Sequence, residues 1–229
     1  MPIRQITRPA CWAGTLTLTL AALLAGCASS PPPQTVLALP TPSLPQASAS
    51  AGNAGTRWLQ LGRLDIPEYW QSRSVRYREG SELKSWEDTV WAERVEVGLT
   101  RNLSIELEHA LPTPWQLCPL RCEGASRRPV RLLVSLSPLD YDRASQNLTA
   151  WAQWTLLGED GQVLRTSSQP LQSKGSGSGA AAQTDAMAGL MKDLAGIVSR
   201  EVPLLPTRRA AAAAAASSAA ERLDAKNAQ

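Results

Sequence analysis

Cysteine and histidine are the side chains best suited to covalent or metal chemistry in this 229-residue chain, and they are few. Cys118 and Cys122 enclose only three residues, and in an oxidising compartment such a pair can close a small disulfide loop. Free thiols, or half of a metal site, are the alternatives. Zinc needs four ligands, and His109 is the only histidine, so we favour the disulfide and expect no metal site.

The acidic and hydroxyl side chains show no catalytic arrangement. The sequence contains no G-x-S-x-G nucleophile elbow, and a single histidine is a weak candidate for a general base. His109 falls near the end of a predicted helix, where a favourable interaction with the helix C-terminus explains it. Four carboxylates have the spacing of a solvated helix face: Glu93, Glu96, Glu106 and Glu108. We therefore expect no catalytic residues and no enzymatic activity.

A glycine-rich stretch, GSGSGA over residues 175–180, has the formal pattern of a dinucleotide-binding loop. Such a loop needs a strand–helix–strand unit with an acidic residue after the second strand. The helix predicted after this stretch leads instead to Pro203 and Pro206. We interpret the stretch as a flexible connection and expect no cofactor.

Cys27 stands at the end of an apolar leader. Residues 1–9 carry Arg4 and Arg8 and no acid, and residues 10–26 are apolar or small. This run is shorter than the roughly 20 residues of a membrane-spanning helix, and no Lys/Arg cluster follows it, so a cleaved signal peptide over 1–26 is favoured. Leu24-Ala25-Gly26-Cys27 matches the lipobox of bacterial lipoproteins.

The lipobox resemblance implies that the Cys27 thiol takes a diacylglycerol, that the chain is cut in front of it, and that the new amine is acylated. Three acyl chains would make an effectively permanent membrane anchor. Residue +2 is Ala28, not the aspartate that resembles an inner-membrane retention signal. The periplasmic face of the outer membrane is therefore the expected location.

The segment after the anchor, 27–55, is rich in Pro, Ser and Ala and has no charge or periodicity. We expect an extended tether here. From Trp58 onward the hydrophobic pattern changes and predicts strands at about 58–66, 74–77, 82–86, 130–136, 148–157 and 163–167. An apolar stripe with a step of four predicts a helix within 88–110, and a second stripe predicts one from about Ala181 to just before Pro203.

The order of strands, helix, strands and helix favours an α+β fold. Each predicted helix has a single apolar stripe, so we expect one two-layer domain over 56–203, with a mixed or antiparallel sheet and both helices on one face. Residues 204–229 form an alanine-rich tail with no face to bury, and it is assigned no role.

The aromatic residues are eight tryptophans, three tyrosines and no phenylalanine. Trp151 and Trp154 must face opposite sides of a regular strand, so one is expected in the core and the other exposed or covered by a partner. Four aromatic residues lie before the first helix: Tyr69, Trp70, Trp86 and Trp91. Core packing is their default explanation, and contact with a partner is the alternative, because Trp and Tyr are enriched at binding hot spots.

The charge balance excludes one class of partner. The chain has a formal charge of +3, and removal of the leader with its two arginines leaves about +1, with no long basic run. Nucleic-acid binding depends on neutralising many phosphates, so no nucleic-acid partner is expected.

Over residues 58–202 the chain resembles the PqiC-type auxiliary lipoproteins of ABC-linked, MCE-domain transport systems. The segments that carry the resemblance follow the lipobox and the Ser/Pro-rich tether in the family's order. They are LGRLDIPEY at 61–69, VWAE at 90–93, AQWTLL at 152–157 and DGQVL at 160–164.

The resemblance implies a non-enzymatic accessory role in moving lipids between the two membranes, with an MCE-domain periplasmic protein as partner and phospholipid as a further candidate ligand. A homo-oligomer is compatible with a symmetric partner, although no residue demands it. Two alternatives stay open: a structural or assembly lipoprotein that binds peptidoglycan or outer-membrane assembly machinery, and a periplasmic hydrolase built around His109.

Overall fold

The computed structural model describes residues 33–44, 55–118 and 128–205. The chain divides into two units, Met1–Gln34 and Thr35–Gln229, and every helix and strand named below belongs to the second. The elements are, in chain order, β1 (Thr35–Leu37), β2 (Arg57–Leu61), the 3-10 helix η2 (Glu68–Trp70), β3 (Ser74–Glu79), β4 (Glu82–Trp91), α2 (Val95–Ala110), β5 (Trp115–Leu117), β6 (Val130–Asp142), β7 (Asn147–Leu157), β8 (Val163–Lys174), α3 (Gly179–Glu201) and the 3-10 helix η3 (Val202–Leu204).

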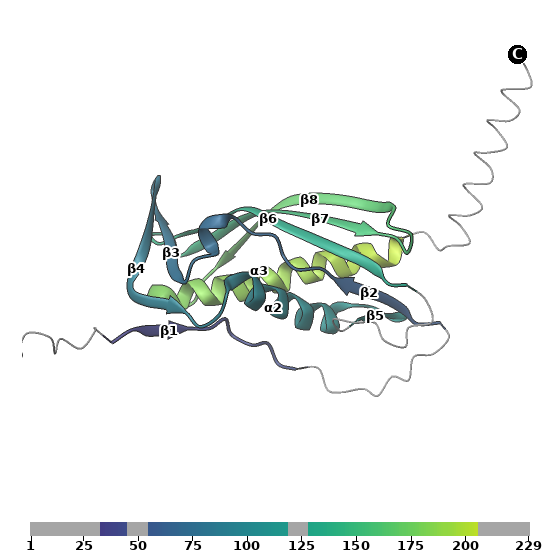
Figure 1. Ribbon diagram of the computed structural model, residues 1–229, viewed down its shortest axis with the longest axis horizontal. Helices are drawn as coiled ribbons and strands as arrows, with labels where there is room; N and C mark the ends of the chain where they lie inside the picture. Colours follow the sequence, from purple (N-terminus) through teal and green to yellow (C-terminus); the bar gives the residue numbers. More distant parts are fainter. Residues whose placement is uncertain (1–32, 45–54, 119–127, 206–229) are drawn as a thin grey trace, which may run out of the picture. The chain divides into compact units, whose positions relative to one another are not determined.

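Strand β6 is the centre of an open, mixed eight-stranded sheet (Figure 1). Along one edge it pairs antiparallel with β7, which in turn pairs with β8. Its other edge is shared, because β2 pairs parallel with its first residues and β3 meets its last residue, Asp142. β5 extends the β2 arm, and β4 followed by β1 extends the β3 arm.

Both helices pack on one face of this sheet (Figure 1). α3 contacts β7, β8 and α2, and α2 also contacts β5. The buried residues of β6 and β7 alternate along each strand, as expected when only one face of a sheet is covered. The predicted α+β fold with a mixed sheet and two helices on one face is confirmed.

The core lies between the sheet and the helices. Leu132, Leu136, Leu148 and Leu156 of the sheet are fully buried, and Met187, Leu190 and Leu194 of α3 are buried with them. Each such side chain contributes about 1.5–3 kcal/mol by leaving water. The stripe that predicted α3 from the sequence is therefore the face that covers the sheet.

The predicted tether over 27–55 is too long, because part of it is folded onto the domain. β1 pairs parallel with β4, with Thr35 opposite Thr89 and Leu37 opposite Trp91. Leu39 is only 5 % exposed, and a Cβ at Gly98 would lie 2.9 Å from its Cδ1, so the glycine leaves room for this leucine. Three paired residues and one buried leucine give too short a pattern to detect in a Pro/Ser-rich sequence.

We call residues 35–43 the strap, because they run from the edge of the sheet along α2. The Ala92 N–H donates to the Leu37 carbonyl at 2.7 Å, and the His109 Nε2 lies 2.7 Å from the Ser43 carbonyl oxygen. His109 is in the last turn of α2, where the sequence placed it. Its described contact is with the strap.

The first helix begins later than its apolar stripe suggested. Trp91 is the last residue of β4, and its N–H donates to the Arg73 carbonyl at 2.8 Å. α2 starts at Val95. Trp91 continues the spacing of the helix only because the end of β4 faces the same core.

Further differences concern the ends of the predicted elements: the strand predicted at 58–66 ends at Leu61, and β4 continues past 86 to Trp91. β5 was not predicted, since it has only three residues. β6 and β8 run well beyond the predicted ends, and β8 continues through Pro170, which a strand tolerates when it lies at the edge of a sheet. At the C-terminal end, Leu205 is still buried, so the packed domain reaches slightly past the predicted boundary at 203.

Candidate functional site

The face of the sheet opposite the helices is the main uncovered surface of the described domain, and we call it the open face. It is formed by residues that alternate with the buried ones and pair with one another across β6, β7 and β8. They include Arg131, Leu133, Ser135, Asp140, Thr149, Trp151, Gln153, Thr155, Thr166, Ser168, Pro170 and Gln172. Most are hydroxyl or amide side chains, so the open face offers mainly hydrogen bonds, with charge at Arg131 and Asp140.

Trp151 and Trp154 divide between the two faces as the sequence predicted. Trp154 is 1 % exposed and belongs to the core, whereas Trp151 is 45 % exposed at the middle of β7. A single exposed large side chain is ordinary on a protein surface, but tryptophan is also enriched at binding hot spots.

A hollow of about 320 Å³ lies on the open face between β6, β7 and the segment after β2, and it reaches Gln153, the next residue of β7 on the same face as Trp151. Its lining includes Leu133, Ser135, Gln153 and Thr155 from the sheet, with Arg63 and Asp65 from the segment after β2. The Ser135 hydroxyl donates to Asp65 Oδ2 at 3.0 Å. The volume is at the lower end of the range for small-molecule sites, and the lining combines two apolar residues, Leu133 and Val134, with five polar or charged ones.

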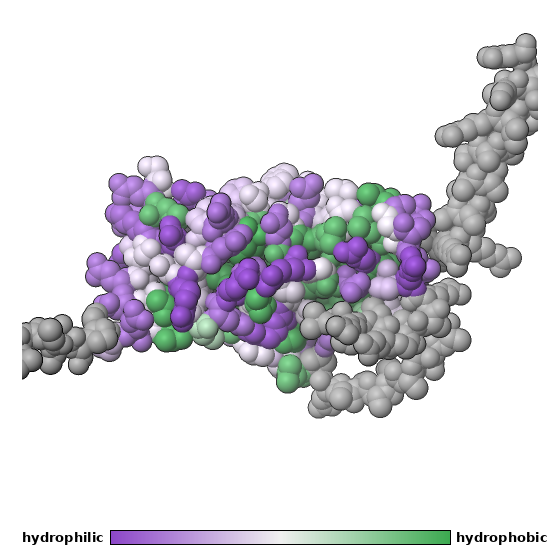
Figure 2. Space-filling view, in the orientation of Figure 1, coloured by the Kyte–Doolittle hydropathy of each residue, from purple (hydrophilic) through white to green (hydrophobic). Residues whose placement is uncertain are grey.

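The exposed hydrophobic residues elsewhere are dispersed. Besides Leu133 and Trp151, the large ones among the described residues are Val36, Leu44, Val97, Val163 and Leu204. In the space-filling view, hydrophobic residues form small patches separated by hydrophilic ones (Figure 2). Such a surface is typical of a protein that contacts partners through limited areas.

Two of the four aromatic residues before α2 are core residues. Trp70 and Trp91 are 1 % and 2 % exposed, which favours the core interpretation for both. The Trp70 Nε1 donates to the Leu139 carbonyl at 2.7 Å and fixes η2 against β6. Tyr69 and Trp86 are half-buried and can still be reached from outside.

Tyr69 contacts the same part of β6, at Leu139 and Asp140. Its hydroxyl lies 3.0 Å from the Leu139 carbonyl and 2.9 Å from Asp140 Oδ1. Burial raises the pKa of Tyr69, and the hydrogen bond to Asp140 and the negative charge of that carboxylate raise it further. Asp140 is also paired with Arg78 at 2.8 Å, so its charge is compensated.

Trp86 belongs to a cluster of contacting aromatic rings on the β3–β4 hairpin. Its ring centroid is 4.6 Å from that of Tyr77, and the Arg143 guanidinium lies 4.8 Å from the Trp86 centroid and 5.1 Å from the Tyr77 centroid. The Trp86 Nε1 donates to Gln183 Oε1 at 2.9 Å. These contacts join the hairpin to the β6–β7 turn and to α3, so the cluster has a structural role on its inner side.

Two carboxylates of the first helix region, Glu93 and Glu96, are paired with arginines. Arg101 Nη1 donates to Glu93 Oε2 at 2.8 Å, and this hydrogen bond is the main cause that lowers the pKa of Glu93. Glu96 was expected on a solvated face, but it is 4 % exposed and contacts Arg63 and Arg94. A buried carboxylate needs such partners, because an unpaired buried charge is costly.

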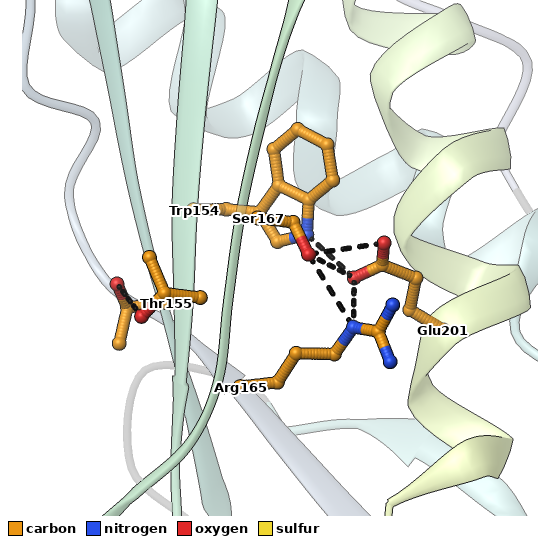
Figure 3. A network of polar contacts seen from close by, with 6 residues as sticks. Trp154, Thr155, Arg165, Ser167 and Glu201 are labelled. Carbon is orange, nitrogen blue, oxygen red and sulfur yellow. Dashed lines mark hydrogen bonds and ion pairs between the residues drawn. The ribbon is translucent and has the colours of Figure 1, made fainter.

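Glu201 forms the most connected polar network at the end of α3 (Figure 3). Its Oε2 accepts hydrogen bonds from Trp154 Nε1 at 2.9 Å, Ser167 Oγ at 3.0 Å and Arg165 Nε at 3.1 Å. These donors come from β7 and β8. The carboxylate therefore fixes the end of α3 to the edge of the sheet, a role that sequence analysis missed because the partners are 34 to 47 residues apart.

The glycine-rich stretch joins β8 to α3, and α3 leads into η3 rather than into a strand. The dinucleotide-binding interpretation is thus unsupported by the topology. Gly175 is needed for packing, because a Cβ there would collide with the backbone of Ala182. Gly177 and Gly179 have φ values of +82° and +68°, which favour glycine.

Cys118 is buried and disulfide-bonded. Cys122 and Cys27 lie outside the described residues, so the pairing of Cys118 with Cys122 and the lipidation of Cys27 stay predictions. In the part of the chain that the structure describes, no group of three or more potential metal ligands occurs. Among the same residues no helix is long and apolar enough to span a membrane.

The family of ABC-type transport auxiliary lipoprotein components matches residues 37–198, from the end of β1 nearly to the end of α3. No curated protein matches the chain in sequence. The resemblance identified from the sequence is thereby confirmed at the level of the family.

Two solved structures share the fold. One is the crystal structure of an uncharacterized protein, with a TM-score of 0.58 and 17 % identity over 74 % of this chain and 99 % of that chain. The other is a Xanthomonas campestris protein of the DUF330 family, with a TM-score of 0.53 and 16 % identity over 72 % of this chain and 92 % of that chain. At these identities the likeness concerns the fold alone.

Proposed function

Because the chain belongs to the family of ABC-type transport auxiliary lipoprotein components, we propose that it is a non-enzymatic accessory subunit of an ABC/MCE-type lipid transport system. The system moves lipids, with phospholipid as the candidate cargo, between the inner and outer membranes. This chain docks onto an MCE-domain periplasmic protein, while a separate subunit hydrolyses ATP. Cys27 carries the lipid that holds the domain at the periplasmic face of the outer membrane.

The observation that carries the proposal is the extent of the family match. It spans residues 37–198 and includes β2 through β8 and both helices. The match is therefore to the whole folded domain and not to a local motif. An accessory role also suits a domain with an uncovered sheet face and a shallow hollow, since both can contact another molecule.

Half-buried Tyr69 and Trp86 are the candidate contact residues for the MCE-domain partner. Each has one side fixed by hydrogen bonds to the domain, at Leu139 and Gln183 respectively. An aromatic ring that is fixed in this way loses little further conformational entropy when a partner covers its exposed side. A homo-oligomer could present several such contacts to a symmetric partner.

The test is to purify the tagged protein from native membranes and to identify the co-purifying proteins by mass spectrometry. Cys27→Ser removes the proposed lipid acceptor, and Cys11→Ser is the matched control in the leader. We expect an MCE-domain protein to co-purify, and the Cys27→Ser protein alone to leave the outer-membrane fraction.

Recovery of outer-membrane assembly proteins without any MCE-domain protein would overturn the transport role. It would support the alternative of a structural or assembly lipoprotein. Retention of the Cys27→Ser protein in the outer membrane would refute the anchor and leave the transport role to be judged on the recovered proteins.

A further inference from the structure

Trp151 lies in a flat apolar strip that crosses three strands of the open face. Pro170 of β8 pairs directly with Trp151, so the two residues share this face. On β6 the register shifts between Leu136 and Leu139, and the bulge residues Ser137 and Pro138 oppose Trp151. Both bulge residues and Pro170 are exposed. The exposed indole is thus flanked by a proline on each neighbouring strand.

Uncharged hydrogen-bonding side chains surround this strip. Thr149 and Gln153 lie on either side of Trp151 along β7, and Gln172 and Ser168 occupy the paired positions of β8. Four charged side chains lie near the strip: Asp140 next to Thr149, paired with Arg78; Asp65, which accepts a hydrogen bond from Ser135; Arg63, which lines the hollow with Asp65; and Arg131 towards the start of β6. The side chains directly around Trp151 on β7 and β8 are uncharged and offer both donors and acceptors.

The hollow adjoins the strip at Gln153, which lines it together with Ser135 and Thr155. Same-face neighbours on a strand are about 6.8 Å apart. The hollow therefore begins about one such step from Trp151, within reach of the units next to a sugar ring packed on the indole.

We propose that the open face binds the glycan strands of peptidoglycan, a polymer of N-acetylated sugars. The C–H faces of sugar rings pack on an indole, and their hydroxyl and acetamido groups bond to side chains such as Gln153, Ser135 and Thr149. An anionic lipid surface or a phosphate would instead require a basic centre, and a homodimer interface would require a more apolar one. The inference depends on the periplasmic placement proposed above and not on the transport role.

The test uses the full-length protein, extracted from membranes in detergent. Two probes are applied: isolated peptidoglycan sacculi in a co-sedimentation assay, and soluble N-acetylglucosamine hexamer in isothermal titration calorimetry. We expect the protein to sediment with sacculi and the hexamer to compete. Trp151→Ala should weaken both interactions at least about tenfold, and Trp151→Phe should lie between the two, because a smaller ring still stacks. Leu204→Ala is the control, since Leu204 is exposed in η3, outside the open face.

The proposal is overturned if the protein does not sediment with sacculi, or if Trp151→Ala sediments as well as the parent. Loss of the MCE-domain protein from the membrane purification of Trp151→Ala, with unchanged binding to sacculi, would assign the face to a protein partner. Glycan binding without any MCE-domain partner would leave this inference intact and refute the transport role. Thermal melting of Trp151→Ala checks that the variant is folded.

Discussion

The two faces of β7 show how one strand can serve two purposes. The residues that face the helices are Leu148, Ala150, Ala152, Trp154 and Leu156, and all are buried. The residues between them are mainly threonine and glutamine around the exposed Trp151. Because successive side chains of a strand point in opposite directions, the core residues and the residues of the open face are separated by a single step along β7. With the open face as the proposed glycan site, substitutions there would change binding at little cost to folding.

Trp154→Ala should show the largest effect and tests the covered face. The change empties a large volume in the core and removes one donor to Glu201. We expect a loss of about 3–5 kcal/mol in the free energy of unfolding, measured by urea denaturation. Trp154→Phe keeps most of the ring and should lose less. A loss below about 1 kcal/mol for the alanine variant would contradict the assignment of this face to the core.

Glu201→Ala should have an intermediate effect at the edge of the covered face. Three donors from β7 and β8 lose their shared acceptor, and we expect a loss of about 1–3 kcal/mol. Hydrogen exchange should also become faster in β8 than in β6, because the Glu201 hydrogen bonds join only β7 and β8 to α3. Glu108→Ala, at an exposed position of α2, is the control. Equal effects of the two substitutions would refute this role of Glu201.

The Glu93–Arg101 pair should give a small effect that depends on pH. Arg101 lowers the pKa of Glu93 below its ordinary value of 4.5, so the folded state stabilises the ionised carboxylate. This contribution is present above the unfolded pKa and is lost as the pH falls through the lower folded pKa. Both side chains are partly exposed, so we expect less than about 1 kcal/mol. In urea titrations between about pH 5 and pH 3, Arg101→Ala should lose less stability than the parent.

Trp151→Ala should have the smallest effect on stability, within about 0.5 kcal/mol, and it sharpens the comparison with Trp154. The two residues have the same chemistry on the same strand, and only the face differs. Urea denaturation of both variants in the same buffer provides the measurement. A loss approaching that of Trp154→Ala would show that Trp151 packs on the domain and is not available to a ligand.

The elements with long hydrophobic patterns could be predicted from the sequence. β7 alternates apolar and other residues over its whole length, and α3 carries an apolar stripe through Met187, Leu190 and Leu194, so their type and facing were evident. The opposite orientations of Trp151 and Trp154 followed from the same periodicity. These features are local, and local order in the sequence is enough to reveal them.

Features that depend on distant pairing could not be predicted. β1 has three residues, and only its pairing with β4 makes it a strand. Glu201 is one carboxylate among many until α3 brings it to Ser167 and Trp154. Glu96 has the spacing of a solvated residue, yet the segment after β2 brings Arg63 to it. In each case the deciding neighbour is far away in the chain, and no local pattern marks it.

The strap also has a mechanical consequence. With a lipid at Cys27, as proposed, only residues 28–34 separate the anchor from β1, and this length of chain spans at most roughly 3 nm. This short connection to the edge of the sheet would keep the domain close to the bilayer. Any pull between the membrane and a bound partner would load the β1–β4 pairing and Leu39 first. The strap would then detach under tension before the core unfolds, and its detachment would lengthen the chain between the anchor and the domain while the domain stays folded.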